Sequence, residues 1–515
     1  MNRRFLAMVV LASTLGLAAC EGDDGAPGAA GAAGAAGAAG TAGPAGPAGN
    51  DGSGTSVGVV ADTVTTLAND LRGLTYAQVA PHENKIYASG HLGTTDATRQ
   101  IVVARFFANG DVDTSFGGDG FVELTATAAT GSSDETAYSV TELQSGDVVV
   151  AANAVDADGG SSVYLFRLDA DGNPVAGWGD AQGKAEVVFG YANADNATFP
   201  GAPGALPSDL SWDIQTDRSV VADRVVVFGQ GSASDGTRTD RDRYIARLNI
   251  TATGAETDAT FNGGSAFSFN ATGVLNDNNR RGTVEADGKI VSAGYTDLGG
   301  ALDNHVFLIR LDATGMLDAT FGGFSDEPTI TATPGIAVFN PFKVDQGFTE
   351  AYAAGFQQST SSYVVVGYVG ATGTGVASTL GYETTVAQDV GVFRVSSGTA
   401  AAIDTGWGNM GTQVVQSEGK GYPTSEDRGR HIVVLDDGRS VVAGRFGGSP
   451  AAFVFTADGQ PDTRVFGDGI IELPNDTISS QFFGIALSPD GSRVAFSTNS
   501  DDNGARVVVV KVALD

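Results

Sequence analysis

The stretch DVDTSFGGDG, residues 111–120, combines carboxylates, two hydroxyl groups, an aromatic ring and three glycines, a composition that suits a catalytic loop. The chain contains similar stretches at residues 173–183, 256–264, 316–323, 402–409 and 460–469. A catalytic site is rarely copied several times within one fold, whereas a structural unit must be, and regular self-similarity is typical of repeat architectures. The repetition therefore indicates a building block.

The residues around each copy form a unit of four short β-rich runs. In the second unit these are AYSVTELQ (137–144), SGDVVVAAN (145–153), VYLFRL (163–168) and the residues after the repeated stretch. Runs of β-branched residues separated by Asp-Gly or Gly-Asp turns are typical of antiparallel hairpins. Four strands in a unit of about 60 residues predict an all-β fold built from propeller blades.

Seven such units can be counted in the chain, and their opening strands lie near Leu74, Ala137, Leu210, Arg281, Ala351, His431 and Phe483. The last unit ends after its third strand, while SVGVVADTV (56–64) precedes the first unit without a blade of its own. Since a free sheet edge invites aggregation, we expect the N-terminal strand to complete the last blade. Residues 56–515 are thus predicted to form a closed seven-bladed β-propeller of four-stranded antiparallel blades.

The combination of a DG turn, a VVAG-like strand, ARL, ADG and DTSFGGDG resembles the delta-60 repeat, a propeller-forming repeat of bacterial surface and secreted proteins. The resemblance covers about residues 72–515 and is strongest at 101–124, 284–323 and 432–473. It implies a propeller fold and no defined biochemical role. The second unit departs from the pattern because Val175 stands where other units have aspartate.

The repeated carboxylates and aromatic rings are interpreted as structural anchors. An aspartate followed by Ser or Thr can accept hydrogen bonds within its own turn, and the aromatic ring is expected to be buried between neighbouring sheets. These anchors are Asp113, Phe116, Trp178, Asp258, Phe261, Asp318, Phe321, Asp404, Trp407, Asp462 and Phe466. Basic residues recur on the third strand, where they are expected to pair with turn carboxylates or carbonyls: Arg105, Arg167, Arg247, Arg310, Arg394 and, in the last unit, Lys511.

The N-terminus MNRRFLAMVVLASTLGLAAC (1–20) has two early arginines, an apolar run and small residues before Cys20. This is the secretory pattern, and its ending resembles a bacterial lipoprotein signal. The resemblance implies a signal peptide at residues 1–19 and acylation of Cys20, which anchors the protein in a membrane, at the outer membrane or cell surface. The alternative is an ordinary signal peptide. Cys20 is the only cysteine of the chain, so no disulfide framework is available.

Residues 20–55 form a spacer in which glycine occupies every third position from Gly22 to Gly52. The period resembles collagen, where only glycine fits the axis of three chains. A collagen-like stalk would make the protein a homotrimer. The alternative is a disordered Gly/Ala tether on a monomer.

The composition excludes one class of partner, because a net charge of −31 repels the phosphates of nucleic acids. Long connections are expected on one face of the ring, where they suit a binding or adhesion surface for a surface protein or glycan. Those connections are residues 125–134, 153–161, 190–208, 230–242, 295–304, 325–347, 369–388 and 415–425.

Signals for catalysis or cofactors are weak. GTSVG (54–58) lies in the Gly-rich join, not on a strand-to-helix turn, and His82, His91, His305 and His431 show no ligand spacing. DADGG (156–160) and DADGN (169–173) suit either calcium or ordinary turns. We therefore expect a binding module without a cofactor, with calcium as an open alternative. A hydrolase or lyase with a site in the central channel and a purely structural envelope protein are the rival functions.

Overall fold

The computed structural model describes most of the chain after residue 58. The described residues are 59–63, 70–95, 98–126, 135–155, 160–180, 183–187, 189, 209–232, 240–271, 276–298, 304–341, 347–371, 388–417, 427–473, 481–499 and 504–512. The expected signal peptide, Cys20, the Gly-x-y segment and GTSVG lie outside the described residues, as do most of the long connections. Within the described ranges no helix is long and apolar enough to cross a membrane.

The described elements are β-strands, joined by one short 3-10 helix at Gln358–Thr360. Three sheets have four strands each. The first contains β6 (Thr136–Glu142), β7 (Val148–Val155), β8 (Ser161–Leu168) and β9 (Lys184–Val187). The second contains β20 (Gly347–Gln357), β21 (Ser362–Ala371), β22 (Asp389–Ser396) and β23 (Thr412–Val415). The third contains β24 (Arg428–Val434), β25 (Ser440–Phe446), β26 (Ser449–Phe455) and β27 (Ile470–Glu472).

Two further sheets have five strands, where four were expected. One contains β10 (Leu210–Thr216), β11 (Arg224–Ser232), β12 (Arg241–Ile250), β13 (Ala255–Thr257) and β14 (Phe267–Phe269). The other contains β15 (Asp277–Val284), β16 (Ile290–Asp297), β17 (Asn304–Leu311), β18 (Phe324–Ser325) and β19 (Ile336–Phe339). In the first of these sheets the extra strand is β13, which lies at the start of the repeated stretch. The equivalent residues of other sheets form only a single bridge, such as Phe106↔Val112.

The remaining sheet has eight strands in two groups. One group is β2 (Asp70–Tyr76), β3 (Ile86–Leu92), β4 (Gln100–Phe106) and β5 (Phe121–Leu124). The other is β28 (Gln481–Leu487), β29 (Arg493–Asn499), β30 (Val507–Lys511) and β1 (Val59–Thr63). A single residue pair, Asp70↔Asn499, joins the two groups. The N-terminal strand β1 pairs antiparallel with β30, from Val59↔Val510 to Thr63↔Val507.

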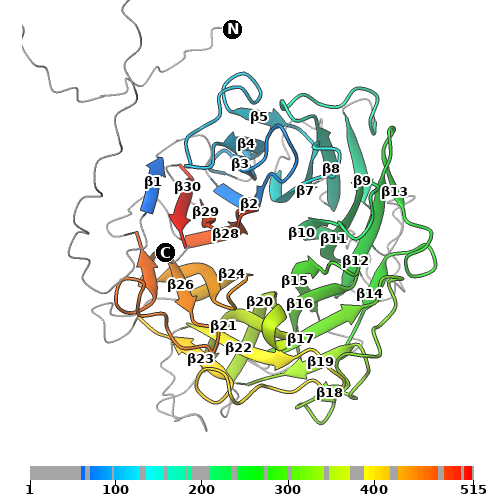
Figure 1. Ribbon diagram of the computed structural model, residues 1–515. Coiled ribbons are helices and arrows are strands. Elements are labelled where there is room, and N and C mark those ends of the chain that lie inside the picture. The colour runs from blue at the N-terminus through cyan, green and yellow to red at the C-terminus, as the bar shows by residue number, and fades with distance from the viewer. Residues whose placement is uncertain are drawn as a thin grey trace, which may run out of the picture. The chain divides into compact units, whose positions relative to one another are not determined.

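The innermost strands of the successive groups contact one another in turn. Contacts run from β2 to β6, β10, β15, β20, β24 and β28, and from β28 back to β2. Figure 1 shows the sheets placed around a common axis, with these strands on the inside. The described ladders are antiparallel, except for the two residue pairs that join β18 to β19; the isolated bridge Gly322↔Thr399 is also parallel.

Apolar residues fill the space between neighbouring sheets. Strands in the middle of a sheet are buried on both faces, as in β7, where seven of eight residues are buried. One core cluster joins Val149 and Trp178 of one sheet to Val227 and Tyr244 of the next. Burial on both faces explains why these strands are continuous runs of valine, isoleucine and alanine rather than strictly alternating.

Candidate functional site

The repeated stretch forms a turn in which one aspartate makes two kinds of bond. In the fourth unit, Asp318 Oδ1 accepts hydrogen bonds from the backbone N–H of Thr320 at 2.9 Å and from its hydroxyl at 2.7 Å. The other oxygen, Oδ2, accepts a hydrogen bond from Nε of Arg310 at 2.8 Å. Burial alone would raise the pKa of Asp318, but the bonds from Thr320 and the charge of Arg310 outweigh burial and lower it.

The third-strand arginines pair with these aspartates in four units: Arg105 with Asp113 at 2.6 Å, Arg247 with Asp258 at 2.8 Å, Arg310 with Asp318 at 2.8 Å and Arg394 with Asp404 at 2.6 Å. Each arginine also donates through Nη1 to a carbonyl of the next sheet. For example, Arg310 reaches the carbonyl of Ser397 at 3.0 Å and Arg247 that of Ala313 at 2.7 Å. In these four units the arginine therefore joins its own sheet to the next one.

The second unit keeps this connection although Val175 replaces the aspartate. Arg167 pairs instead with Asp147, in the turn between β6 and β7, at 2.7 Å. Its Nη1 donates to the carbonyl of Thr251 in the following sheet at 2.9 Å. A carboxylate from a different turn thus compensates for the missing one.

The aromatic anchors Phe116, Trp178, Phe261, Phe321 and Trp407 are fully buried. The prediction that Phe466 is the buried anchor of the sixth unit is wrong, because Phe466 is 61% exposed and Val465 is buried in its place. In the four other units that have the aspartate, the buried residue lies three positions after it, and the third position after Asp462 is Val465. Phe466 occupies the following position, where φ is +46°; Gly117, Gly322 and Gly408 adopt the left-handed conformation at the equivalent position.

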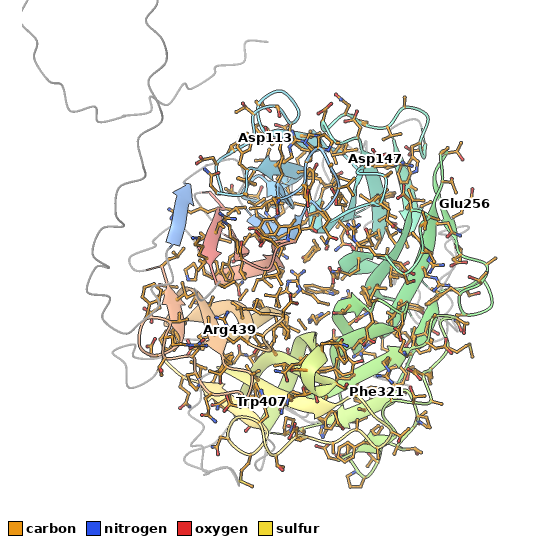
Figure 2. The ribbon with its side chains drawn as sticks, in the orientation of Figure 1. Asp113, Asp147, Glu256, Phe321, Trp407 and Arg439 are labelled. Atoms are coloured by element: carbon orange, nitrogen blue, oxygen red, sulfur yellow. The ribbon has the colours of Figure 1, made fainter. Side chains whose placement is uncertain are left out.

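Figure 2 places Asp113, Asp147, Phe321 and Trp407 in the outer part of the ring, away from its axis. The two aspartates bind side chains of the fold, and the two aromatic rings are buried in the core. The geometry gives them a structural role.

A different arrangement surrounds the axis. Each innermost strand has a β-bulge near its start, and a bulge leaves a residue unpaired and redirects its side chain. The bulges fall between Leu71 and Gly73, Ala137 and Ser139, Ser211 and Asp213, Asn279 and Gly282, Ala351 and Ala353, Gly429 and His431, and Phe482 and Gly484. The first residue inside each bulge is Arg72, Tyr138, Trp212, Arg280, Tyr352, Arg430 or Phe483. We call these seven residues the axial belt.

The side chains of the axial belt contact one another around the whole axis. Guanidinium carbons lie over ring centroids at 5.2 Å (Arg72 and Phe483), 4.5 Å (Arg72 and Tyr138), 4.2 Å (Arg280 and Trp212), 5.1 Å (Arg280 and Tyr352), 4.8 Å (Arg430 and Tyr352) and 5.6 Å (Arg430 and Phe483). Tyr138 and Trp212 close the circle with ring centroids 5.0 Å apart and nearly perpendicular planes. Such cation–π pairs each contribute about 0.5–2 kcal/mol.

Polar partners fix the orientation of the belt arginines. Nε of Arg72 donates to Asp70 at 2.6 Å, and Nε of Arg430 donates to Gln481 at 2.7 Å. Nη2 of Arg280 donates to the hydroxyl of Tyr295 at 2.7 Å. The planar guanidinium groups are therefore held in defined orientations.

On four of the seven innermost strands the next residue is polar, namely Ser139, Asp213, Arg281 and His431, and these residues add a second layer. Asp213 accepts a hydrogen bond from the hydroxyl of Ser139 at 2.8 Å and lies 3.8 Å from the guanidinium of Arg281. Burial raises the pKa of Asp213, against the lowering influence of Arg281. His431 accepts a hydrogen bond from the backbone of Ile485, and burial together with Arg281 lowers its pKa well below the usual value.

An acid and three tyrosines lie beside Arg280 and Arg430. Tyr295, Tyr352 and Tyr368 form one small cluster, and Glu350 accepts a hydrogen bond from Asn304 at 2.7 Å. Burial raises the pKa of Glu350. Burial also acts to raise the pKa of Tyr352, but the charges of Arg280 and Arg430 outweigh it and lower the pKa.

The other sequence candidates have structural explanations or fall outside the described residues. In DADGN, Asp169 accepts hydrogen bonds from the backbone of Asp171 and Asn173, which is ordinary turn chemistry. His91 faces Thr136 at 3.2 Å and Asp70 at 4.0 Å through the same ring nitrogen, so the three do not form a catalytic relay. Within the described ranges, no three His, Cys, Asp or Glu residues gather as metal ligands.

Sequence reasoning did not single out the axial belt. When the seven innermost strands are aligned on the bulge, each has an arginine or an aromatic residue in its third position. The aligned segments are DLRGLTY, TAYSVTE, LSWDIQT, NNRRGTV, EAYAAGF, RGRHIVV and QFFGIAL. That alignment is the signal that could have identified the belt.

Comparisons with known proteins agree with the arrangement of sheets. The model described as "Domain of unknown function (DUF5122) beta-propeller" matches residues 84–116 and 285–321. No curated protein matches the chain. The fold class is therefore a β-propeller.

Solved structures are similar at low identity. Sqt1 from Chaetomium thermophilum is 10% identical, with a TM-score of 0.42, over 87% of this chain and 98% of that one. The Dos1 propeller is 10% identical with a TM-score of 0.40, over 88% and 94%. The propeller domain of the Trilobed protease from Pyrococcus furiosus is 7% identical with a TM-score of 0.38, over 86% and 96%. These likenesses concern the fold alone.

Proposed function

We propose that residues 56–515 form a closed seven-bladed propeller and that the chain is an exported, lipid-anchored binding module. The eight-stranded sheet supports the count of seven, since its two groups of four strands share a single residue pair. The pairing of β1 with β30 supports closure by the N-terminal strand.

Deleting residues 56–64 tests closure. Without β1, the edge of β30 loses its partner, and its residues Val507–Val510 are apolar and buried. An exposed edge of this kind templates aggregation, so we expect a lower melting temperature and oligomers in light scattering. Deleting residues 25–33 is the matched control, since it removes as many residues from the Gly-x-y segment. Equal melting temperatures for the two deletions would contradict closure.

The lipid anchor rests on the signal-like N-terminus and on Cys20. Replacing Cys20 by serine is expected to abolish incorporation of radiolabelled palmitate and to release the protein from membrane pellets. Unchanged membrane association of the Cys20→Ser variant would refute the anchor.

The observation that carries the binding function is the axial belt. The repeated aspartates, arginines and aromatic residues of the outer part of the ring, which we call the rim, make their contacts within the fold. The axial belt instead places arginine and aromatic side chains around the axis, and Arg72, Tyr138 and Trp212 are half-buried there. Arginine and aromatic residues dominate recognition surfaces because they combine large contact area with several donors. We propose that an extracellular protein or glycan binds the ring face where the innermost strands begin, and that the long connections contribute to this face.

The test is a binding screen of the full chain against glycans and surface proteins, with and without calcium. A Trp212→Ala, Arg72→Ala variant should lose the ligand, while the rim variant Arg464→Ala should retain it. Retention of the ligand by the belt variant would move the binding surface elsewhere.

An enzyme is the second candidate, because Tyr352 has a lowered pKa between two arginines. A tyrosine of this kind can act as a general base. Turnover of an acidic polysaccharide that Tyr352→Phe abolishes, without loss of binding, would favour the enzyme over the binding module.

A further inference from the structure

We infer that Arg280 and Arg430, on either side of Tyr352, form a binding site for a carboxylate or phosphate group. The inference rests on the proposed binding function and names the chemistry that the axis would recognise.

The first observation is an excess of buried positive charge. Arg280 is 7% exposed and Arg430 is 8% exposed. Within the described part of the chain, neither guanidinium has a carboxylate oxygen within 4.0 Å, whereas Arg72 has Asp70 at 2.6 Å and Arg281 has Asp213 at 3.8 Å. Glu350 acts on Arg280 only from beyond that distance. Burying a charge without a close partner is unfavourable by several kcal/mol, and an anion that reaches the edges of both guanidinium groups beside Tyr352 would compensate for it.

The second observation is a pair of unused donors at one point of the belt. Nε of Arg280 and Nε1 of Trp212 are buried and have no hydrogen-bond acceptor among the described residues. The two side chains touch, because the guanidinium carbon of Arg280 lies 4.2 Å from the centre of the Trp212 ring. Buried donors of this kind normally have an acceptor, and the oxygens of a carboxylate or phosphate are acceptors without donors.

The third observation is that the arginines are already oriented. Arg430 is stacked on Tyr352 and Phe483 and bonded to Gln481 through Nε. Arg280 is stacked on Trp212, Tyr295 and Tyr352. Arg280 already donates through Nη1 to the carbonyl of Asn279 at 3.1 Å and through Nη2 to the hydroxyl of Tyr295 at 2.7 Å, which leaves its Nε for an anion. A guanidinium held in this way loses little conformational freedom when it binds an anion.

The charge of these arginines could instead be balanced internally by ionised Tyr352. The two explanations differ in what they predict without any ligand. If Tyr352 is ionised near neutral pH, the protein absorbs at 295 nm at pH 8 and the Tyr352→Phe variant does not. That result would overturn the anion site.

Titration of the full-length protein with inorganic phosphate and with acetate, each against chloride at constant ionic strength, tests the site. We expect saturable binding of one anion per chain by calorimetry and a change in tryptophan fluorescence. The chain has three tryptophans, and Trp178 and Trp407 are fully buried at the rim. Trp212→Phe should therefore remove the fluorescence change. The anion that binds more tightly identifies the ligand group.

Arg280→Gln and Arg430→Gln should each weaken the anion at least tenfold, and Arg430→Lys, which keeps the charge, should weaken it less. Arg464→Gln is the control, since Arg464 is a half-exposed rim arginine paired with Asp462 at 2.7 Å. Near-UV circular dichroism shows that each variant is folded. No saturable binding, or equal binding in the two glutamine variants and the control, would mean an adventitious ion only and would refute the site. The titration needs no protein or glycan partner. The anion site can therefore be refuted while the binding screen succeeds, and it can be confirmed while the screen finds no ligand.

Discussion

The rim and the axis of this ring are both repeated, but they repeat different things. At the rim, the same residue types recur, as in Asp318 with Arg310 and Asp258 with Arg247. At the axis, the same backbone irregularity recurs, and the side chain on it changes from arginine to tyrosine, tryptophan or phenylalanine. Constant chemistry at a repeated position indicates a joint between units. Varied chemistry at a repeated position indicates a surface that can be shaped for a ligand.

The carboxyl groups of the two regions differ in the same sense. At the rim, hydrogen bonds and arginine charges outweigh burial, and they lower the pKa values of Asp113, Asp258 and Asp318. On the innermost strands burial prevails, and it raises the pKa values of Asp213 and Glu350. Rim acids are satisfied by the fold, while acids near the axis are kept out of water without full compensation.

The largest expected loss of stability follows from removing an aromatic ring from the core at the rim. Phe321→Ala empties a fully buried site between two sheets, which typically destabilises a protein by about 3–5 kcal/mol. The melting temperature followed by near-UV circular dichroism should fall clearly. Phe466→Ala is the matched control, because Phe466 is in the same kind of turn but exposed. If both variants melt alike, the rim aromatics are not anchors.

Arginine removal compares rim and axis directly. Arg310→Ala leaves Asp318 buried without its ion-pair partner and should destabilise the fold by about 3 kcal/mol. Arg430→Ala removes two cation–π contacts and the hydrogen bond to Gln481 but no ion pair among the described residues, so a loss of about 1–2 kcal/mol is expected. Denaturant unfolding measures both. A larger loss for Arg430 than for Arg310 would reverse the assignment of structural and binding roles.

The pH dependence of stability should have two limbs. Burial raises the pKa of Asp277, on the innermost strand β15, to about 6. At Asp277 the folded state then binds a proton more readily than the unfolded state, so the contribution of Asp277 to stability should rise as the pH falls from 7 towards about 4. His431, whose pKa is lowered by burial, acts in the opposite direction over the same range. Below the ordinary aspartate pKa of about 3.9, stability should fall as Asp113, Asp258 and Asp318, whose folded pKa values are lowered, become protonated.

Two variants separate these limbs in urea unfolding at several pH values. Asp277→Asn should remove the contribution of Asp277 to the upper limb, and Asp318→Asn should weaken the lower one. Equal changes in stability between pH 7 and pH 4 for the wild type and Asp277→Asn would be incompatible with the difference between rim and axis.

The smallest effect concerns Phe466, whose φ of +46° places an exposed ring in a conformation that favours glycine. Phe466→Gly should stabilise the fold by about 1 kcal/mol, because left-handed backbone costs a residue with a Cβ atom about 1–2 kcal/mol and glycine loses part of that gain through unfolded-state entropy. Phe466→Ala, which keeps the Cβ atom, should give no gain in melting temperature. Equal gains for the two variants would attribute the effect to the ring.

The sequence predicted the β-rich repeat because hairpin turns and third-strand arginines keep the same spacing from unit to unit. The error at Phe466 came from counting aromatic residues rather than positions after the aspartate, since Val465 fills the core there. The axial belt was not predicted, because a bulge is a property of pairing between two strands. Arg72 and Trp212, for example, are different types of residue, and only the register of their strands shows that their positions are equivalent.

The pairing of β1 has a mechanical consequence. Among the described strands, β1 pairs only with β30, through Val59↔Val510, Ala61↔Val509, Asp62↔Val508 and Thr63↔Val507. Tension that acts on β1 at residue 59 is carried by this short ladder. We therefore expect a pull on residue 59 to separate β1 from β30 first.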